Sequence, residues 1–156
     1  MSKQDLTRSE ALQKLQRYCA YQDRCHAEVR KKLMDLNVYG DDMENVITDL
    51  IQEDFLNEER YARSYVRGKV RIKKWGRFKI RQHLKHNQIS EYCIKKGMEE
   101  IDEELYQQNI LSLLGRYQIE KGSLKPYLFK RKFLDFMQRK GYSYEELHDY
   151  VKDLES

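Results

Sequence analysis

The stretch IRQHLKHNQISEYCIKKGMEEI, residues 80–101, decides the fold because its spacing of apolar residues occurs three times in the chain. VRKKLMDLNVYGDDMENVITDL (residues 29–50) and FLDFMQRKGYSYEELHDYVKDL (residues 133–154) align with it without a gap. In each copy the apolar positions follow at steps of 4, 5, 5, 4 and 3 residues. They are Val29, Leu33, Val38, Met43, Ile47, Leu50; Ile80, Leu84, Ile89, Ile94, Met98, Ile101; and Phe133, Met137, Tyr142, Leu147, Val151, Leu154. Such self-similarity indicates a repeat architecture.

Within each copy the spacing predicts a helix, a turn and a second helix. The first step of four residues is one stripe of a short helix, and the closing steps of four and three are the stripe of another. The step of five between them spans a turn, marked by Asn37, Asn87 and Gly141. Ser143 with Glu146 has the spacing of a capping box, and the equivalent serine of the second copy is placed to cap its helix.

A further amphipathic helix is predicted before each of these pairs. Thr7 and Glu10 have capping-box spacing, Asn57 is placed to cap the helix before the second copy, and Pro126 lies at or near the start of a helix. Their stripes are Ala11, Leu12, Leu15, Tyr18; Tyr61, Ala62, Tyr65, Val66; and Ile110, Leu111, Leu114, Tyr117. We therefore predict an all-α fold of three tandem three-helix repeats in an elongated, curved molecule, because one module of about 50 residues is marginal alone. The predicted repeats are residues 1–55, 56–101 and 102–156.

Charge is distributed unevenly along the chain. Residues 60–90 contain eleven Lys and Arg and no acidic residue, whereas the rest of the chain carries 19 basic and 26 acidic residues. Concentrated positive charge repels itself, and an anionic partner relieves that cost, so we favour contact with nucleic-acid phosphates over a merely solvated surface. Residues 23–59 hold eleven acidic and four basic residues, which fits either a protein-contact face or a solvated helix surface.

The candidate contact residues lie within this basic segment. They are Arg67, Lys69, Arg71, Lys73, Lys74, Trp75, Arg77, Lys79, Arg81 and Lys85. Two interpretations stay open for Trp75, which either stacks on exposed bases or packs in the core. For Phe78 we expect a place in the core. Basic residues recognise phosphates without regard to sequence, so we expect contacts with single- and double-stranded DNA that read no bases.

The segment Phe55–Leu84, FLNEERYARSYVRGKVRIKKWGRFKIRQHL, resembles the signature of the RecX family. In that signature an aromatic residue follows an Arg, a Tyr lies four residues on, and basic residues lead through a Gly to an Ile-x-x-x-Leu helix. The matching positions are Arg60, Tyr61, Tyr65, Arg71, Gly76, Ile80 and Leu84. Residues 11–33 and 130–151 are also similar to the family, so the resemblance covers about residues 9–154.

The resemblance implies three tandem three-helix repeats and a partner, the RecA recombinase. RecX proteins bind along the groove of the recombinase filament on DNA, inhibit strand exchange and ATP hydrolysis, and promote filament disassembly. They regulate DNA repair and recombination and bring no catalytic residues. The third repeat departs from many relatives in its aromatic residues, which are Tyr117, Tyr127, Phe129, Phe133, Phe136, Tyr142 and Tyr144. The alternative is a helix-turn-helix DNA-binding transcription regulator, although such proteins usually dimerise and only the middle copy is strongly basic.

Several other classes of protein lack support in the sequence. No apolar run approaches the ~18 residues of a membrane span, and the N-terminal segment has no apolar region of a secretory signal, so we expect a cytoplasmic protein. Cys19, Cys25 and Cys93 fit reduced thiols. Neither a metal site at the first two with His26 nor a nucleotide-binding or catalytic motif is indicated. We expect a monomer that has no cofactor and no enzymatic activity.

Overall fold

The computed structural model describes residues 6–154, and every regular element in that range is helical. The elements are α1 (Arg8–Tyr21), α2 (His26–Asp35), α3 (Gly40–Gln52), α4 (Glu58–Gly68), η1 (Lys69–Lys73), α5 (Arg77–His86), α6 (Glu91–Met98), α7 (Glu103–Lys121), α8 (Pro126–Lys140) and α9 (Tyr144–Val151). Residues 1–5 and 155–156 lie outside the described range. The first of these belong to the N-terminal segment in which we expected no secretory signal. No helix between residues 6 and 154 is long and apolar enough to span a bilayer.

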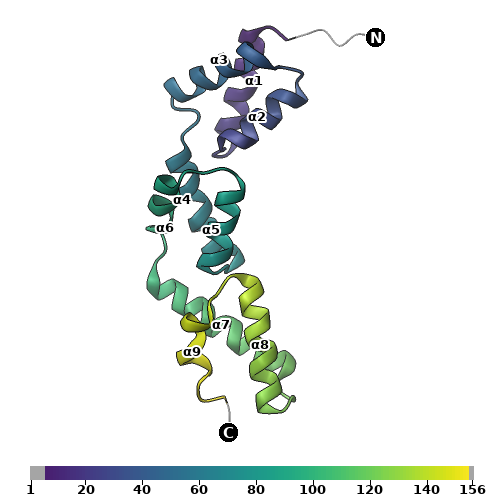
Figure 1. The fold of residues 1–156 in the computed structure, drawn as a ribbon, viewed down its shortest axis with the longest axis vertical. Helices are drawn as coiled ribbons and strands as arrows, with labels where there is room; N and C mark the ends of the chain where they lie inside the picture. The colour runs from purple at the N-terminus through teal and green to yellow at the C-terminus, as the bar shows by residue number, and fades with distance from the viewer. Residues whose placement is uncertain (1–5, 155–156) are drawn as a thin grey trace, which may run out of the picture.

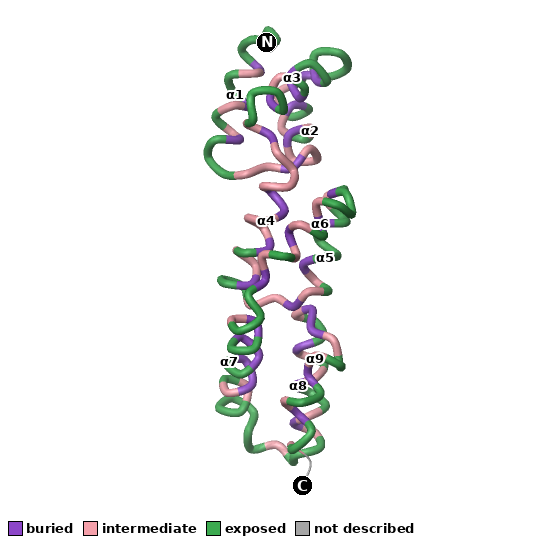
Figure 2. The backbone as a smooth tube through the Cα atoms, turned by 90° about the vertical axis from the view of Figure 1, so that its left-hand side faces the viewer, coloured by how far each residue is buried: buried purple, intermediate pink, exposed green. Residues whose placement is uncertain are grey.

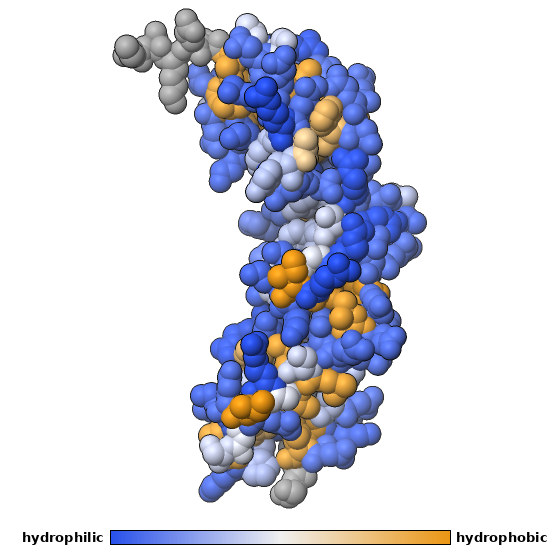
Figure 3. All heavy atoms as spheres, turned by 180° about the vertical axis from the view of Figure 1, so that it is seen from behind, coloured by the Kyte–Doolittle hydropathy of each residue, from blue (hydrophilic) through white to orange (hydrophobic). Residues whose placement is uncertain are grey.

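The nine α-helices of residues 6–154 are arranged as three groups of three along the long axis of the molecule (Figure 1). Helices α1–α3 lie at the N-terminal end, α4–α6 in the middle and α7–α9 at the C-terminal end. We call these groups repeats 1, 2 and 3. The space-filling view shows a bowed outline (Figure 3). The predicted all-α fold of three-helix repeats in an elongated, curved molecule is confirmed.

The three copies share the turn that ends their first helix. Asn37, Gln88 and Gly141 occupy equivalent positions and have left-handed φ values of 63°, 62° and 105°. In each copy the amide of this residue donates to the carbonyl three residues earlier, over 2.9 to 3.0 Å. The next amide donates to the carbonyl five residues earlier, which is the Schellman pattern. In the second copy the left-handed residue is thus Gln88, one position after the Asn87 that we took to mark the turn.

The helix starts follow the predicted caps. Thr7 with Glu10 and Ser143 with Glu146 form capping boxes. The remaining predicted caps also form: the Asn57 side chain accepts from the amide of Arg60, that of Ser90 accepts from the amide of Cys93, and Pro126 is the first residue of α8. Two caps were not predicted. Asp102 caps α7, and the Glu28 carboxylate accepts from the amide of Cys25 at the start of α2.

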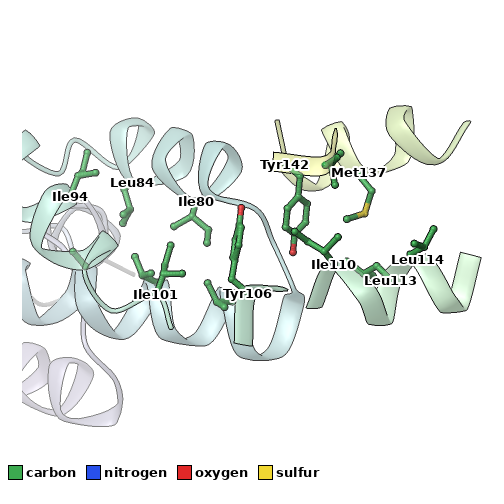
Figure 4. Close-up of a cluster of buried hydrophobic side chains, with 14 of the residues drawn as sticks. Ile80, Leu84, Ile94, Ile101, Tyr106, Ile110, Leu113, Leu114, Met137 and Tyr142 are labelled. Atoms are coloured by element: carbon green, nitrogen blue, oxygen red, sulfur yellow. The ribbon is translucent and has the colours of Figure 1, made fainter. Parts of the chain in front are cut away.

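The apolar stripes form two separate cores. All eighteen predicted apolar positions of the three copies are buried except Met98 and Leu154, which are half-buried. One core belongs to repeat 1, whereas the other continues from repeat 2 into repeat 3. Buried stretches of backbone recur along all three repeats (Figure 2). Figure 4 shows how it continues: Tyr106 and Tyr142 lie between Ile80 on one side and Met137 on the other. Repeats 2 and 3 therefore share one hydrophobic interior.

Candidate nucleic-acid interface

The basic segment contains an irregular turn between α4 and α5. After Gly68 the chain enters the π-helical turn η1, which ends at Lys74 in the left-handed region with φ 55°. The extended Gly76 then starts α5. A π-helical turn widens a helix by one residue and often lies at functional sites. Here it presents successive basic residues on an irregular bend, residues 69–76, rather than on one regular helix.

Repeat 3 holds this bend in place. The Tyr142 hydroxyl donates to the Lys74 carbonyl over 2.7 Å, and the buried Asn109 side chain donates to the Val70 carbonyl over 2.8 Å. Val70 lies inside the π-helical turn and Lys74 directly follows it. Because these acceptors receive hydrogen bonds from α7 and from the turn that follows α8, the shape of the bend depends on the packing of repeat 3 against repeat 2.

The backbones of the two repeats also touch directly. The amide of Gly76 donates to the carbonyl of Lys140 over 2.8 Å, and the amide of Phe78 donates to that of Gly141 over 3.0 Å. A Cβ on Gly76 would lie 2.3 Å from the backbone of Gly141, and one on Gly141 would lie 2.5 Å from the Cβ of Lys79. Glycine is therefore required at both positions for this approach.

Three of the predicted contact residues are engaged by carboxylates. Arg67 pairs with Glu100 over 3.2 Å, and the exposed Lys85 pairs with Glu91 over 3.7 Å. Arg77 forms ion pairs with Glu103 and Glu146, and its guanidinium lies 4.1 Å from the ring centre of Tyr106. The pKa of Arg77 is raised because its bonds to these carboxylates outweigh the opposing effect of burial. Arg77 thus acts as a strut between repeats 2 and 3.

The other six predicted cations make no ion pair with any residue in the range 6–154. They are Lys69, Arg71, Lys73, Lys74, Lys79 and Arg81. Arg71, Lys73 and Arg81 are exposed, whereas Lys69, Lys74 and Lys79 are half-buried. These six cations therefore have no carboxylate partner among the described residues, as the lack of acidic residues in the segment suggests. Carboxylates outside the segment pair only with Arg67, Arg77 and Lys85 among the predicted contact residues.

Trp75 is packed between basic side chains. The ammonium groups of Lys69 and Lys79 lie 4.7 and 4.4 Å from its ring centre, and the imidazole of His83 lies at 4.8 Å. The indole is half-buried against the core that repeats 2 and 3 share. Its ring orders two lysines through cation–π contacts. A base would have to displace these neighbours before it could stack there.

Phe78 was expected in the core, and this expectation is wrong, because its side chain is 64% exposed. The reason lies in helical geometry. On α5 the buried stripe is Ile80 and Leu84, and a residue two positions before Ile80 points about 200° away from it. Phe78 is thus an exposed aromatic side chain beside Lys79 and one turn from Arg81.

Two further cations join the bend from repeat 3, and sequence reasoning missed both. Lys140, the last residue of α8, donates from its ammonium group to the Lys73 carbonyl over 3.2 Å. Burial and the positive charges of Lys79, Lys74, Arg116 and Lys73 lower the pKa of Lys140. Arg116 lies one turn after Ser112 on the same side of α7, and Ser112 accepts from Lys74 over 3.1 Å, so Arg116 belongs to the same cluster. No sequence signal marked them, since they lie far from residues 60–90 and only the packing of repeat 3 brings them near.

No group of three or more His, Cys, Asp or Glu that could hold a metal ion occurs between residues 6 and 154. Cys19 and Cys25 are buried free thiols, and burial raises the pKa of each to about 11. At neutral pH both are therefore protonated, which is the form that packs in an apolar interior.

The middle of the chain matches a known protein family. A family model described as RecX, second three-helix domain, matches residues 57–98, which include α4, the bend, α5 and α6. The regulatory protein RecX of Clostridium botulinum (strain Alaska E43 / Type E3) is 30% identical over 129 residues, which are 81% of this chain and 59% of that protein. The chain is similar to RecX proteins in its middle repeat and over most of its length.

Other RecX proteins are similar over more of the chain. The regulatory protein RecX of Lactobacillus johnsonii is 26% identical over 145 residues, covering 93% of this chain and 53% of that protein. The crystal structure of RecX from Lactobacillus salivarius superposes with a TM-score of 0.82 at 23% identity, covering 94% of this chain and 96% of that one. This likeness supports the fold. The chain spans about half the length of the curated RecX relatives that it matches.

Proposed function

We propose that this chain is a RecX-family protein that regulates a RecA-type recombinase by binding its filament on DNA. In this proposal it slows strand exchange and ATP hydrolysis by the filament, and so regulates DNA repair and recombination. The observation that carries the proposal is the bend of repeat 2 with the first turns of α5, where six cations lack an ion pair within residues 6–154. Its relatives are named regulatory proteins, which supports action through binding rather than catalysis.

The elongated shape suits binding to a polymer. A chain of three repeats, bound as a monomer along the filament groove, would contact successive subunits at once, and linked weak contacts strengthen one another through effective concentration. Repeat 2 would face the DNA phosphates. Repeat 1 would face the recombinase with its acidic helices, where Asp41 and Asp42 lie in the exposed first turn of α3. We place this activity in the cytoplasm.

The DNA contact in this proposal is a phosphate contact without sequence preference. Arg71, Lys73 and Arg81 are exposed and would neutralise phosphates, releasing condensed counterions. Phe78, rather than Trp75, is the aromatic side chain open for stacking on an unpaired base. Such a surface would hold both single- and double-stranded DNA.

The test is ATP hydrolysis by the matching RecA on single-stranded DNA, with the chain added in substoichiometric amounts. We expect hydrolysis to fall with the wild-type chain. Arg71→Gln with Arg81→Gln should relieve the inhibition, because each phosphate that is no longer neutralised weakens binding by about 5-fold near 0.1 M salt. Arg77 is left intact, since its removal would leave Glu146 and Glu103 unpaired.

The matched control is Lys14→Gln with Lys31→Gln, which removes the same charge from exposed positions of repeat 1. It should inhibit as the wild type does. Unchanged inhibition by the Arg71 and Arg81 variant would remove DNA contact at the bend from the proposal. If the wild-type chain leaves hydrolysis unchanged but binds one duplex sequence selectively, the protein is a transcription regulator instead.

A further inference from the structure

Five cations from two different repeats surround the contact between α5 and the end of α8. Lys73 and Lys74 come from the end of the π-helical turn, and Lys79 comes from the first turn of α5. Arg116 of α7 and Lys140 of α8 come from repeat 3. We call these five residues the joint cluster. No ion pair connects any of them to a carboxylate within residues 6–154.

The joint cluster is held by fixed geometry rather than by chance proximity of flexible side chains. Lys140 is tied to repeat 2 twice, through its carbonyl to the amide of Gly76 over 2.8 Å and through its ammonium group to the Lys73 carbonyl over 3.2 Å. Lys74 donates to the Ser112 hydroxyl of α7 over 3.1 Å. The close approach of Gly141 to Lys79 places that residue on the same contact.

The local electrostatics is unfavourable without an anion. Burial and four neighbouring positive charges lower the pKa of Lys140, so its charged form is disfavoured. The nearby carboxylates of Glu103 and Glu146 do not relieve this repulsion, because both pair with Arg77. A surface lined by one sign of charge attracts ligands of the opposite sign, and a bound anion would relieve this repulsion.

We propose that the joint cluster is a phosphate-binding site that holds the backbone of a single-stranded nucleic acid across the contact between repeats 2 and 3. The proposal deepens the function proposed above and takes its ligand from it. Phosphate is the group that suits several ammonium and guanidinium donors converging from different helices. Because the donors come from both repeats, a bound strand would also fasten repeat 3 to the bend.

The test measures binding of a fluorescent 30-nucleotide single-stranded DNA to the full chain at several salt concentrations. Arg116→Gln with Lys140→Gln removes charge only from repeat 3. We expect affinity near 0.1 M salt to fall by about 5- to 25-fold, and the slope of log K against log salt to shrink by about 0.7 for each phosphate that is no longer neutralised. Lys121→Gln with Lys132→Gln, at exposed positions of the same two helices, is the matched control and should bind as the wild type does.

Two further measurements make the result unambiguous. Lys140 is half-buried, so Arg116→Gln alone, compared with Lys121→Gln, tests the site without touching the Lys140 hydrogen bond and should weaken binding by about 5-fold. Inorganic triphosphate is the second probe. It should compete with DNA only weakly, whereas tight triphosphate binding by a chain that does not bind DNA would overturn the assignment to a nucleic-acid backbone.

The two proposals fail in different ways. If the Arg71 and Arg81 variant binds DNA more weakly while the Arg116 and Lys140 variant matches its control, the joint cluster is not a phosphate site and the proposed regulatory function still stands. If the wild-type chain neither binds DNA nor slows the recombinase, the proposed function itself is wrong. Weaker binding confined to the joint-cluster variant, with its slope reduced, would support the site.

Discussion

The contact between repeats 2 and 3 includes backbone hydrogen bonds, a shared core and the ion pairs of Arg77, whereas the contact between repeats 1 and 2 combines ion pairs around Arg60 with the burial of Cys25 against repeat 2. Arg60 pairs with Asp23 over 2.8 Å and with Asp54 over 3.2 Å, and the amide of His26 donates to Glu58 over 3.4 Å. These groups are partly exposed, and water screens such pairs. The two joints thus differ in strength although the repeats share one pattern.

The difference can be followed at one pair of equivalent positions. Gly76 starts α5 as Cys25 starts α2, 51 residues earlier. Without a side chain, Gly76 lets the turn at Gly141 close onto its backbone. Cys25 instead sends its thiol into the core of repeat 2 near Tyr61, and its amide is taken by Glu28 of its own helix. Tandem copies can therefore keep the same fold and still join with different rigidity.

The largest effect is expected for Gly141→Ala, which attacks the contact between repeats 2 and 3. Alanine would be strained at φ 105°, and its Cβ would lie 2.5 Å from that of Lys79. Left-handed strain and overpacking together should cost about 3 kcal/mol in the free energy of unfolding. Amide hydrogen exchange should show reduced protection at Ile80 and Leu84 but not at Leu33, whose core is separate.

Gly115→Ala is the matched control for that substitution. Gly115 lies inside α7, and nothing stands within 4 Å of a Cβ placed on it. Alanine there should raise stability by up to about 1 kcal/mol through helix propensity. If Gly141→Ala reduced protection equally in all three repeats, the two cores would unfold together and the proposed difference between the joints would disappear.

A smaller effect is expected for Asn109→Ala, which leaves the Val70 carbonyl of the bend without its donor. Asn109 is 4% exposed, so the removal of a buried hydrogen bond should cost about 2 kcal/mol in urea unfolding. Ser112→Ala, one turn further along α7, removes only the exposed bond to Lys74 and should change stability by less than about 0.5 kcal/mol. Equal effects of the two substitutions would mean that the bend does not depend on the buried contact.

These contacts show where sequence reasoning succeeded and where it stopped. The stripes and caps are local, so the helices and their turns could be predicted from spacing alone. Gln88 aligns with Asn37 and Gly141 in the three copies, and the same periodicity places Phe78 off the buried face of its helix. The sequence therefore already contained the signals for the left-handed turn residue and for the exposure of Phe78.

The joint cluster and the ion pairs of Arg77 could not be predicted from the spacing of residues along the chain. Lys140 lies 67 positions after Lys73, and Arg116 lies 42 positions after Lys74. Glu146, which pairs with Arg77, lies 69 positions after it. Nothing in a single sequence states which end of α8 packs on α5. Charge patterns therefore indicated a basic surface, whereas its composition depended on how the repeats are joined.

The smallest effect on global stability is expected for Arg60→Ala, which weakens the contact between repeats 1 and 2. Partly exposed ion pairs are worth about 1 kcal/mol or less, so the melting curve should move little. The rate at which iodoacetamide alkylates the buried Cys25 at pH 8 should nevertheless rise by about 5-fold, because the free energy of local opening falls by about 1 kcal/mol. Mass spectrometry of the alkylated peptides measures this rate.

Cys19 provides the internal control, because it is buried inside repeat 1 and burial raises its pKa to about 11, as it does for Cys25. Arg60 also acts to lower the pKa of Cys19, so its removal alone should leave Cys19 no more reactive, and faster alkylation of Cys19 would report greater access. Cys93 is half-buried and should react before either. Acceleration of Cys25 without Cys19 would place a hinge between repeats 1 and 2. Equal acceleration of both would show instead that Arg60 stabilises the whole of repeat 1, and that the joint does not open separately.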